Sequence, residues 1–207
     1  MSSMAAKIMR RVSAHPTGKW VCTPKDFLDF GSREAIDQAL SRLARSDRLR
    51  RIGHGLYDRP RFSNVLRRPA PVDLDAAVSA LARRDGVQIL PDGMASANQL
   101  GLTNAVPAKV SFVTDGYSRT LKIEGRTVRF RHASPSVMKW VGRPSASVVQ
   151  ALRWLGPAAA EDARVLSTLS RTLSEEVKVD LLRNIRDLPG WVLPLLREIT
   201  TEHHDAI

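Results

Sequence analysis

The 207-residue sequence has little of several things, and each shortage excludes a class of protein. Cys22 is the only cysteine, so neither an internal disulfide nor a cysteine-based zinc site is possible. The longest strongly apolar stretch, residues 191–196, is interrupted by Pro194 and is far too short to span a bilayer. Arginines interrupt the apolar part of the N-terminal segment, which therefore lacks the core of a signal peptide. We expect a cytoplasmic protein that has no membrane association.

Recognisable enzyme motifs are also missing. There is no glycine-rich phosphate loop, the histidines show no metal-ligand spacing, and GMASANQ lacks the pattern of a nucleophile elbow. Asp115, Glu124 and Lys122 form only a faint version of a metal-dependent nuclease site, at turn positions where acids are common anyway. We therefore expect no enzyme activity, no cofactor and no resident metal ion.

Positive charge, in contrast, is abundant and unevenly distributed. The net charge is +11, and residues 1–70 hold 15 Lys/Arg against 6 Asp/Glu, whereas residues 71–207 hold 17 against 15. The first third of the chain thus carries most of the excess, which is expected when one domain binds a polyanion. A basic surface that only confers solubility, or a genome that favours arginine, is the alternative explanation.

Residues 23–58 have the outline of a winged helix-turn-helix. Cap signals predict a short helix over 24–30 that stops at a glycine, and a second helix that runs from a Ser32 cap to about residue 46. Two short strands joined by Gly53-His54-Gly55 follow. A helix-turn-helix lays its second helix in the DNA major groove.

A helical wheel separates the second helix into an apolar face and a polar face. The residues expected in the core are Ile36, Ala39, Leu40 and Leu43. Gln38 and Arg42 lie on or beside the opposite face. Because glutamine pairs bidentately with adenine and arginine with guanine, we predict that these two residues read bases.

The other predicted DNA contacts are basic or hydroxyl side chains at a helix N-terminus, on the polar face of the second helix or on the basic hairpin, where they can meet phosphate, a base edge or the minor groove. The full predicted set is Thr23, Lys25, Ser32, Arg33, Gln38, Ser41, Arg42, Arg45, Arg48, Arg50, Arg51 and His54. The alternative for each helix residue is a solvated face without a role, and for His54 an exposed turn.

Beyond this module the pattern changes. Residues 61–71 combine proline with arginine, which is typical of a linker and extends the basic surface. The remainder predicts a helix over 73–84, strands over 109–131 joined by tight turns, and helices from 134 to 200. We therefore predict an α+β fold: a winged helix-turn-helix domain over 1–60, a linker over 61–71, and a mixed domain over 72–207 with a small antiparallel sheet and a helical C-terminal part.

Residues 90–116, 118–134 and 148–156 resemble the C-terminal domain of AbiEi-type antitoxins. The most specific match is the element formed by Gly101, Leu102, Thr103, Val106 and Pro107. Gly55-Leu56-Tyr57 is similar to the hairpin that ends the winged helix of these proteins, and the whole resemblance covers about residues 4–187.

The resemblance implies a repressor that binds double-stranded DNA at inverted repeats in the promoter of its own operon. It also implies an antitoxin of the type IV arrangement, which counters a nucleotidyltransferase-like toxin without forming a stable complex with it. A protein-interaction module that inhibits a toxin directly and a metal-dependent nuclease are the alternatives.

Overall fold

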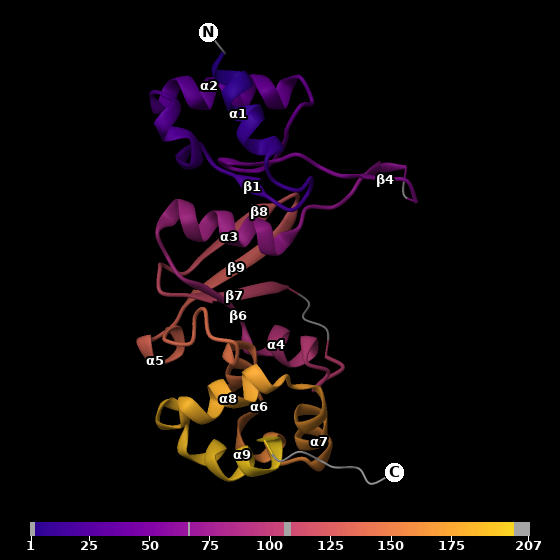
Figure 1. Cartoon of the computed structure of the whole chain (residues 1–207), viewed down its shortest axis with the longest axis vertical. Helices are drawn as coiled ribbons and strands as arrows, with labels where there is room; N and C mark the ends of the chain where they lie inside the picture. The colour runs from indigo at the N-terminus through magenta and orange to yellow at the C-terminus, as the bar shows by residue number, and fades with distance from the viewer. Residues whose placement is uncertain (1–2, 66, 106–108, 201–207) are drawn as a thin grey trace. The chain divides into compact units, whose positions relative to one another are not determined.

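A computed structural model of the protein describes residues 3–65, 67–105 and 109–200. It contains both helices and small sheets (Figure 1), and it confirms the predicted α+β class. The chain divides into two compact units. The N-terminal unit comprises the chain up to Val87 together with Leu121–Thr127, and the C-terminal unit comprises Gln88–Thr120 and the chain from Val128 onward.

The N-terminal unit contains three α-helices, one 3-10 helix and five short strands within the described residues. In chain order these are α1 (Met4–Ser13), β1 (Val21–Cys22), η1 (Pro24–Phe30), α2 (Arg33–Arg45), β2 (Arg50–Gly53), β3 (Leu56–Asp58), β4 (Phe62–Ser63), β5 (Arg68–Pro69) and α3 (Leu74–Asp85). The short helix predicted over 24–30 is present as a 3-10 helix, and it ends as predicted before Gly31.

The core of the N-terminal unit lies beneath α2. The residues predicted to face inward on this helix are buried: Ile36, Ala39, Leu40 and Leu43. They pack against Ile8 and Val12 of α1 and against Phe27 of η1. Burial of these side chains is the main favourable contribution to folding, and it fixes which face of α2 remains outside.

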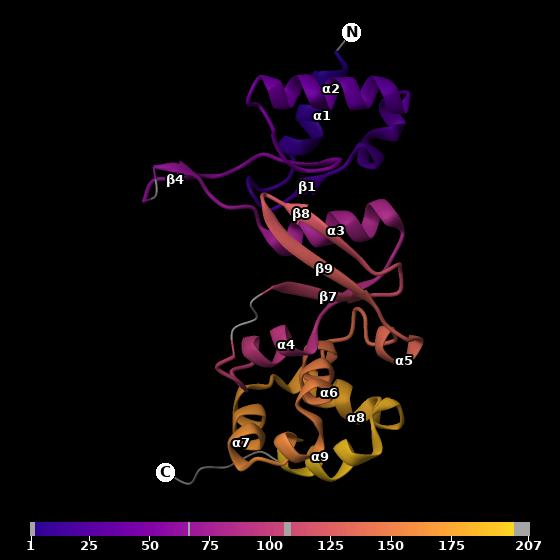
Figure 2. The same cartoon turned by 180° about the vertical axis from the view of Figure 1, so that it is seen from behind.

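Two sheets complete the N-terminal unit. The first has the strand order β1-β3-β2, and Asp58 at its centre is paired with Val21 on one side and Arg50 on the other. The second is the β4–β5 hairpin, in which Phe62 pairs with Pro69. This hairpin lies inside the predicted linker and projects away from α1 and α2 (Figures 1 and 2). Two-residue strands have no periodicity, so sequence patterns do not reveal them.

The helix α3 also belongs to the N-terminal unit, although we predicted that a second domain begins at residue 72. Arg83 of α3 donates from Nη2 to the Val21 carbonyl of β1 at 2.9 Å, and Lys19 donates to Asp73 at the start of α3. Such contacts between distant parts of the chain leave no signal in the composition. The sequence therefore did not show that the N-terminal unit extends to Val87.

The C-terminal unit contains a sheet and a group of helices. Its elements are β6 (Ile89–Pro91), α4 (Gly93–Gln99), β7 (Val110–Thr114), β8 (Arg119–Ile123), β9 (Arg126–His132), α5 (Pro135–Met138), α6 (Ala146–Ala160), α7 (Ala163–Thr172), α8 (Glu175–Arg183), η2 (Ile185–Asp187), η3 (Gly190–Val192) and α9 (Leu193–Thr200). Residues 121–127, at the tip of the β8–β9 hairpin, are the part counted with the N-terminal unit.

The sheet is not the simple meander that the turn signals suggest. Its strand order is β6-β7-β9-β8, and β7 pairs with β9 in parallel, with Phe112 opposite Phe130. Asp115 and Gly116 therefore do not join neighbouring strands. The Glu124-Gly125 turn does, and both residues have positive φ, as a two-residue hairpin loop requires.

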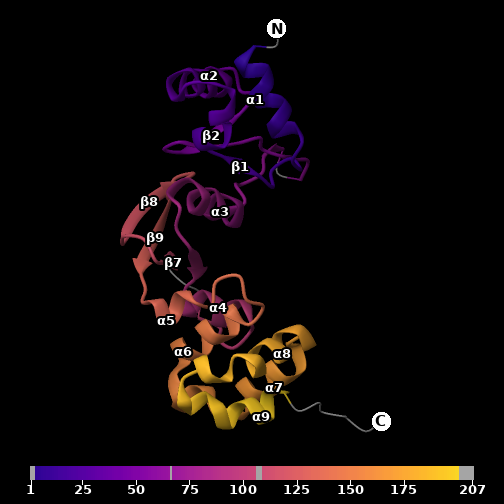
Figure 3. The same ribbon diagram turned by 60° about the vertical axis from the view of Figure 1, so that its left-hand side comes forward.

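Helices α6 to α9 enclose the main core of the C-terminal unit (Figure 3). Leu152, Leu169 and Leu181 are each at most 1% exposed. Among the described residues, the helices all lack the length or the apolar character needed to cross a membrane. Val106 and Pro107, which belong to the antitoxin-like element, lie outside the described residues.

Candidate nucleic-acid interface

Most of the predicted DNA contacts lie on α2. Ser32 begins this helix, because its Oγ accepts a hydrogen bond from a first-turn backbone N–H at 3.3 Å. With the apolar face buried in the core, the opposite face is left to solvent or a ligand. That face presents Gln38, Arg42 and Arg45, which are exposed, and Ser41, which is half-buried.

The cations of this face have few partners inside the protein. Arg42 makes one long hydrogen bond, from Nε to the Gln38 carbonyl at 3.4 Å. Arg45 and Arg48 are exposed, and their side chains form no hydrogen bond or ion pair with another described residue. A guanidinium without an internal partner can donate to phosphate or to the edge of guanine.

A groove of about 400 Å³ runs beside this cationic row. Arg42 and Arg48 line one part of it, and Ser3 and Met4 at the start of α1 line another. None of the residues around the groove is acidic. The groove therefore extends a positively charged surface from the end of α2 to the start of α1.

Arg33, a predicted contact in the first turn of α2, is paired. Its Nε donates to Asp37 Oδ2 at 2.9 Å, and the two side chains are 58% and 48% exposed. Exposed pairs of this kind contribute only about 0–1 kcal/mol. Arg33 can therefore exchange Asp37 for a phosphate at little cost, so the pairing does not remove it from the interface.

Two other predicted contacts have partners inside the N-terminal unit, and burial excludes the first of them from the surface. Thr23 is fully buried, and its hydroxyl donates to Asp26 Oδ2 at 3.0 Å, so it stabilises the start of η1 and cannot reach DNA. Lys25 is exposed, but its Nζ lies 3.3 Å from the Arg84 carbonyl at the end of α3. A cation is favourable at a helix C-terminus, and this accounts for the lysine without a nucleic acid.

Arg50 is the largest departure from the predicted set. Its guanidinium donates to both carboxylate oxygens of Asp58, at 3.0 and 2.6 Å, to the Ala70 carbonyl at 2.9 Å and to Glu124 at 2.5 Å. The pKa of Arg50 is raised, chiefly by the hydrogen bonds to Asp58. With its donors committed inside the unit, Arg50 holds the fold together and is not a phosphate contact.

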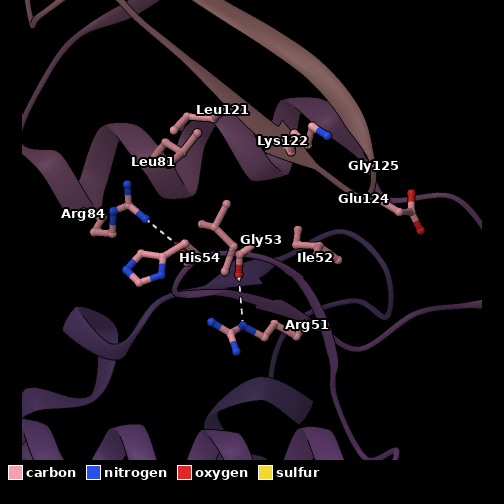
Figure 4. Close-up of a pocket in the computed structure, with 11 residues that line it drawn as sticks. Arg51, Ile52, Gly53, His54, Leu81, Arg84, Leu121, Lys122, Glu124 and Gly125 are labelled. Carbon is pink, nitrogen blue, oxygen red and sulfur yellow. Dashed lines mark hydrogen bonds between the residues drawn. The ribbon is translucent and has the colours of Figure 1, made fainter.

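Arg51 of β2 and His54 of the β2–β3 turn lie beside a cavity of about 580 Å³ (Figure 4). Both are exposed, and Arg51 makes only a long hydrogen bond to the Gly53 carbonyl at 3.4 Å. The His54 carbonyl accepts from Arg84 Nη1 at 2.9 Å, which holds the turn against α3. Both side chains are accessible from outside, and their contact with DNA stays a prediction.

The β4–β5 hairpin contributes no residue to the predicted set of DNA contacts. Arg61, Arg67 and Arg68 are exposed on it. Phe62 and Val65 are 60% and 92% exposed, unusually high for large apolar side chains. DNA-binding arms combine arginine with apolar side chains that insert between base steps. Arginines between prolines in the sequence could have indicated such an arm, but the same composition is typical of a linker.

The acids considered for a nuclease have structural partners. Asp115 Oδ1 accepts from the Gln88 N–H at 2.8 Å, and Glu124 accepts from Arg50 and from the Val72 N–H. Within the described parts of the chain, no group of three or more His, Cys, Asp or Glu side chains is arranged to hold a metal ion.

Comparison with known proteins gives a family but no function. No functionally curated protein matches the chain. A family of unknown function (DUF6088) matches residues 7–181, which is most of the chain, and the protein therefore belongs to this family.

Proposed function

We propose that the N-terminal unit is a winged helix-turn-helix that binds double-stranded DNA with sequence specificity. In this assignment, η1, the turn at Gly31-Ser32 and α2 form the helix-turn-helix, and the β2–β3 hairpin is the wing. The chain order α1, β1, η1, α2, β2, β3 and the sheet order β1-β3-β2 support it.

The observation that carries the proposal is a row of exposed arginines on and after α2, namely Arg42, Arg45 and Arg48, whose side chains form no ion pair with any described residue. Unpaired guanidiniums on one face repel one another, and a polyanion relieves that repulsion. The apolar face of the same helix is fully buried. The helix is thus held firmly on one side and presents charge on the other.

The polar side chains of α2 are suited to two kinds of contact, with bases and with phosphates. Gln38 and Arg42 lie near the middle of the outward face, where a recognition helix meets base edges. Ser32, Arg33 and Arg45 lie toward its ends and suit phosphate contacts. Arg51, His54 and the arginines of the β4–β5 hairpin would extend the contact along the backbone or into the minor groove.

The resemblance to AbiEi-type antitoxins suggests the biological role. We propose a repressor in the cytoplasm that binds inverted repeats in its own promoter and counters a nucleotidyltransferase-like toxin without a stable complex. The C-terminal unit would carry the antitoxin activity. The antitoxin role is supported by the resemblance alone. The exposed arginines of α2 support the DNA-binding part of the proposal.

DNA binding is tested by fluorescence anisotropy with the DNA upstream of the gene and with random duplex of equal length. We expect tighter binding to the upstream DNA and an affinity that falls steeply as salt rises. Arg45→Gln should reduce the slope of log K against log salt by about 0.9, the contribution of one phosphate contact. Arg164→Gln, which removes an exposed charge from α7 of the C-terminal unit, is the matched control. Equal affinity for both DNAs would contradict sequence-specific recognition.

Base reading is tested with the same assay and a panel of single-base variants of the best site. Arg42→Ala should cost about 1–3 kcal/mol on the native site and flatten the preference at one position, because a bidentate base contact is lost. Gln38→Ala should act likewise at another position. A uniform loss on every sequence would reassign both residues to phosphate contacts.

The antitoxin role is tested by coexpression with the product of the neighbouring gene. Rescue of growth without copurification of the two proteins would support a type IV antitoxin. A stable copurifying complex would instead favour direct inhibition by a protein-interaction module, and absence of rescue would contradict both.

A further inference from the structure

The C-terminal unit contains a polar cavity that the proposed DNA-binding function does not use. Its volume is about 510 Å³, within the range of small-molecule sites. It lies where the end of β9, the segment that leads into α5, the start of α4 and one face of α6 meet. The side chains that give it chemical character are Arg131, His132, Gln150, Arg153 and Trp154.

The charge of this cavity is positive. Arg131 and Arg153 both line it, and none of the lining residues is acidic. Arg153 makes one weak hydrogen bond, from Nη2 to the Ser136 carbonyl at 3.4 Å. His132 Nδ1 lies 3.0 Å from the Gly116 carbonyl, which holds the ring in place. Neither guanidinium has a carboxylate partner among the described residues, which favours an anionic ligand, and their planar donors match phosphate.

Hydrogen-bond donors at the cavity are also left unsatisfied. Gln150 is only 6% exposed, and its buried Nε2 has no partner in the described structure. The buried Nε of Arg153 likewise has none. Buried polar groups are nearly always hydrogen-bonded, because an unpaired one costs free energy. Gln150 and Arg153 are three residues apart on α6 and so lie on one face of it, directed to the same cavity.

Trp154 gives the cavity an aromatic rim. It follows Gln150 by one helical turn and is 42% exposed, although large apolar side chains are normally buried. Gly93 holds α4 tightly against it, since a Cβ on this glycine would lie 2.4 Å from Trp154 Cβ. The backbone under the indole is therefore fixed by packing. An exposed indole beside arginines is suited to stack on a planar ring.

We propose that this cavity binds a small anion that carries a planar ring, of the nucleoside monophosphate class. The phosphate binds to Arg131 and Arg153, the ring stacks on Trp154, and the Gln150 amide donates to an acceptor on the ring or the sugar. This site is independent of α2, and its existence does not depend on DNA binding.

The test is calorimetric titration of the full chain with AMP, GMP, CMP and UMP, together with tryptophan fluorescence. We expect at least one nucleotide to bind and to quench the fluorescence, and Trp154→Phe to remove most of that quench. Inorganic phosphate should bind at least about tenfold more weakly, because it cannot stack. Failure of all four nucleotides to bind, or phosphate binding as tightly as the nucleotides, would overturn the proposal.

Arg153→Gln and Arg129→Gln separate the site from the general charge of the unit. Both remove one arginine, but Arg129 is exposed on β9 outside the cavity lining. We expect Arg153→Gln to weaken binding roughly tenfold to a hundredfold, the range for a lost charge-assisted hydrogen bond, and Arg129→Gln to change it less than twofold. Thermal unfolding and DNA binding of both variants should match the parent. Equal losses in the two variants would refute a specific site.

Discussion

Replacement of Arg50 by methionine provides the sharpest test of how the N-terminal unit is held together. Methionine keeps most of the length of the side chain but removes all four donated hydrogen bonds. The Asp58 carboxylate then loses its only ion-pair partner in the described structure while its side chain is 2% exposed. Glu124 and the Ala70 carbonyl each lose a donor as well.

The magnitude follows from the burial of each partner. Removing one member of a buried ion pair typically costs 3–5 kcal/mol, because the remaining charge is left uncompensated. Arg50 and Glu124 are 22% and 28% exposed, so water can reach that half of the network. We therefore expect the lower end of the range, about 3 kcal/mol. Domains are typically stable by 5–15 kcal/mol, so the loss is large but does not abolish folding.

The single cysteine provides an assay that is specific to this unit. Cys22 lies in β1 opposite Tyr57, it is fully buried, and burial raises the pKa of its thiol. A thiol reagent reaches Cys22 only when the strand opens, so the labelling rate measures the free energy of opening. A loss of about 3 kcal/mol increases that rate roughly a hundredfold.

Arg51→Met, at the neighbouring and exposed position of β2, is the control. It removes the same charge but should change the labelling rate less than about threefold, because surface substitutions stay within about 0.5 kcal/mol. The pair Arg50→Met and Asp58→Leu together should recover much of the loss, since no buried charge remains. Equal labelling rates for the two single variants would refute the structural role of Arg50 and would leave it among the predicted DNA contacts.

The remaining predictions concern packing and acid stability. The pKa of Asp73 is lowered below its ordinary value of 3.8, chiefly because Lys19 Nζ donates to its carboxylate. The ionised carboxylate therefore stabilises the fold above about pH 4, and this contribution is lost as the pH falls through the depressed pKa. Asp73→Asn should reduce the fall of the unfolding free energy at acid pH, measured by denaturant titration. Gly93→Ala should destabilise the C-terminal unit by about 1–3 kcal/mol through overpacking, measured by urea unfolding against Gly190→Ala, where the added carbon meets no atom within 4 Å. Leu40→Ala should cost about 2–5 kcal/mol because it opens a cavity in a fully buried position, and a loss below 1 kcal/mol in the same assay would mean that α2 does not depend on its apolar face.

Local signals predicted helix α2 well. Ser32 as a cap, the apolar spacing of Ile36, Leu40 and Leu43, and the polar outward face are all present in the structure as expected. These features depend only on residues within one or two turns of the helix, and such short-range chemistry is legible in a sequence. The outward position of Gln38 and Arg42 follows from the same periodicity.

The role of individual side chains was harder to predict where partners are distant. Arg50 looked like another cation of a basic hairpin, but Glu124, one of its partners, is 74 residues away in the chain. Thr23 was correctly identified as a cap and wrongly as a DNA contact, because caps and phosphate contacts use the same residue types and only burial separates them. The cavity beside Trp154 is lined by residues from four separate segments of the chain, so no local sequence pattern could predict it.

The contacts of Glu124 affect the order in which the protein can fold during synthesis. Residues up to Val87 emerge from the ribosome long before residue 124, yet the N-terminal unit uses the Glu124 carboxylate for Arg50 and for the Val72 N–H. Domains commonly fold during synthesis, in order of emergence. The hydrogen-bond network of Arg50 is therefore complete only after the tip of the β8–β9 hairpin has been synthesised. Before that, Arg50 can pair with Asp58, but the Glu124 carboxylate is missing. A fragment cut after Val87 would remain permanently at that incomplete stage.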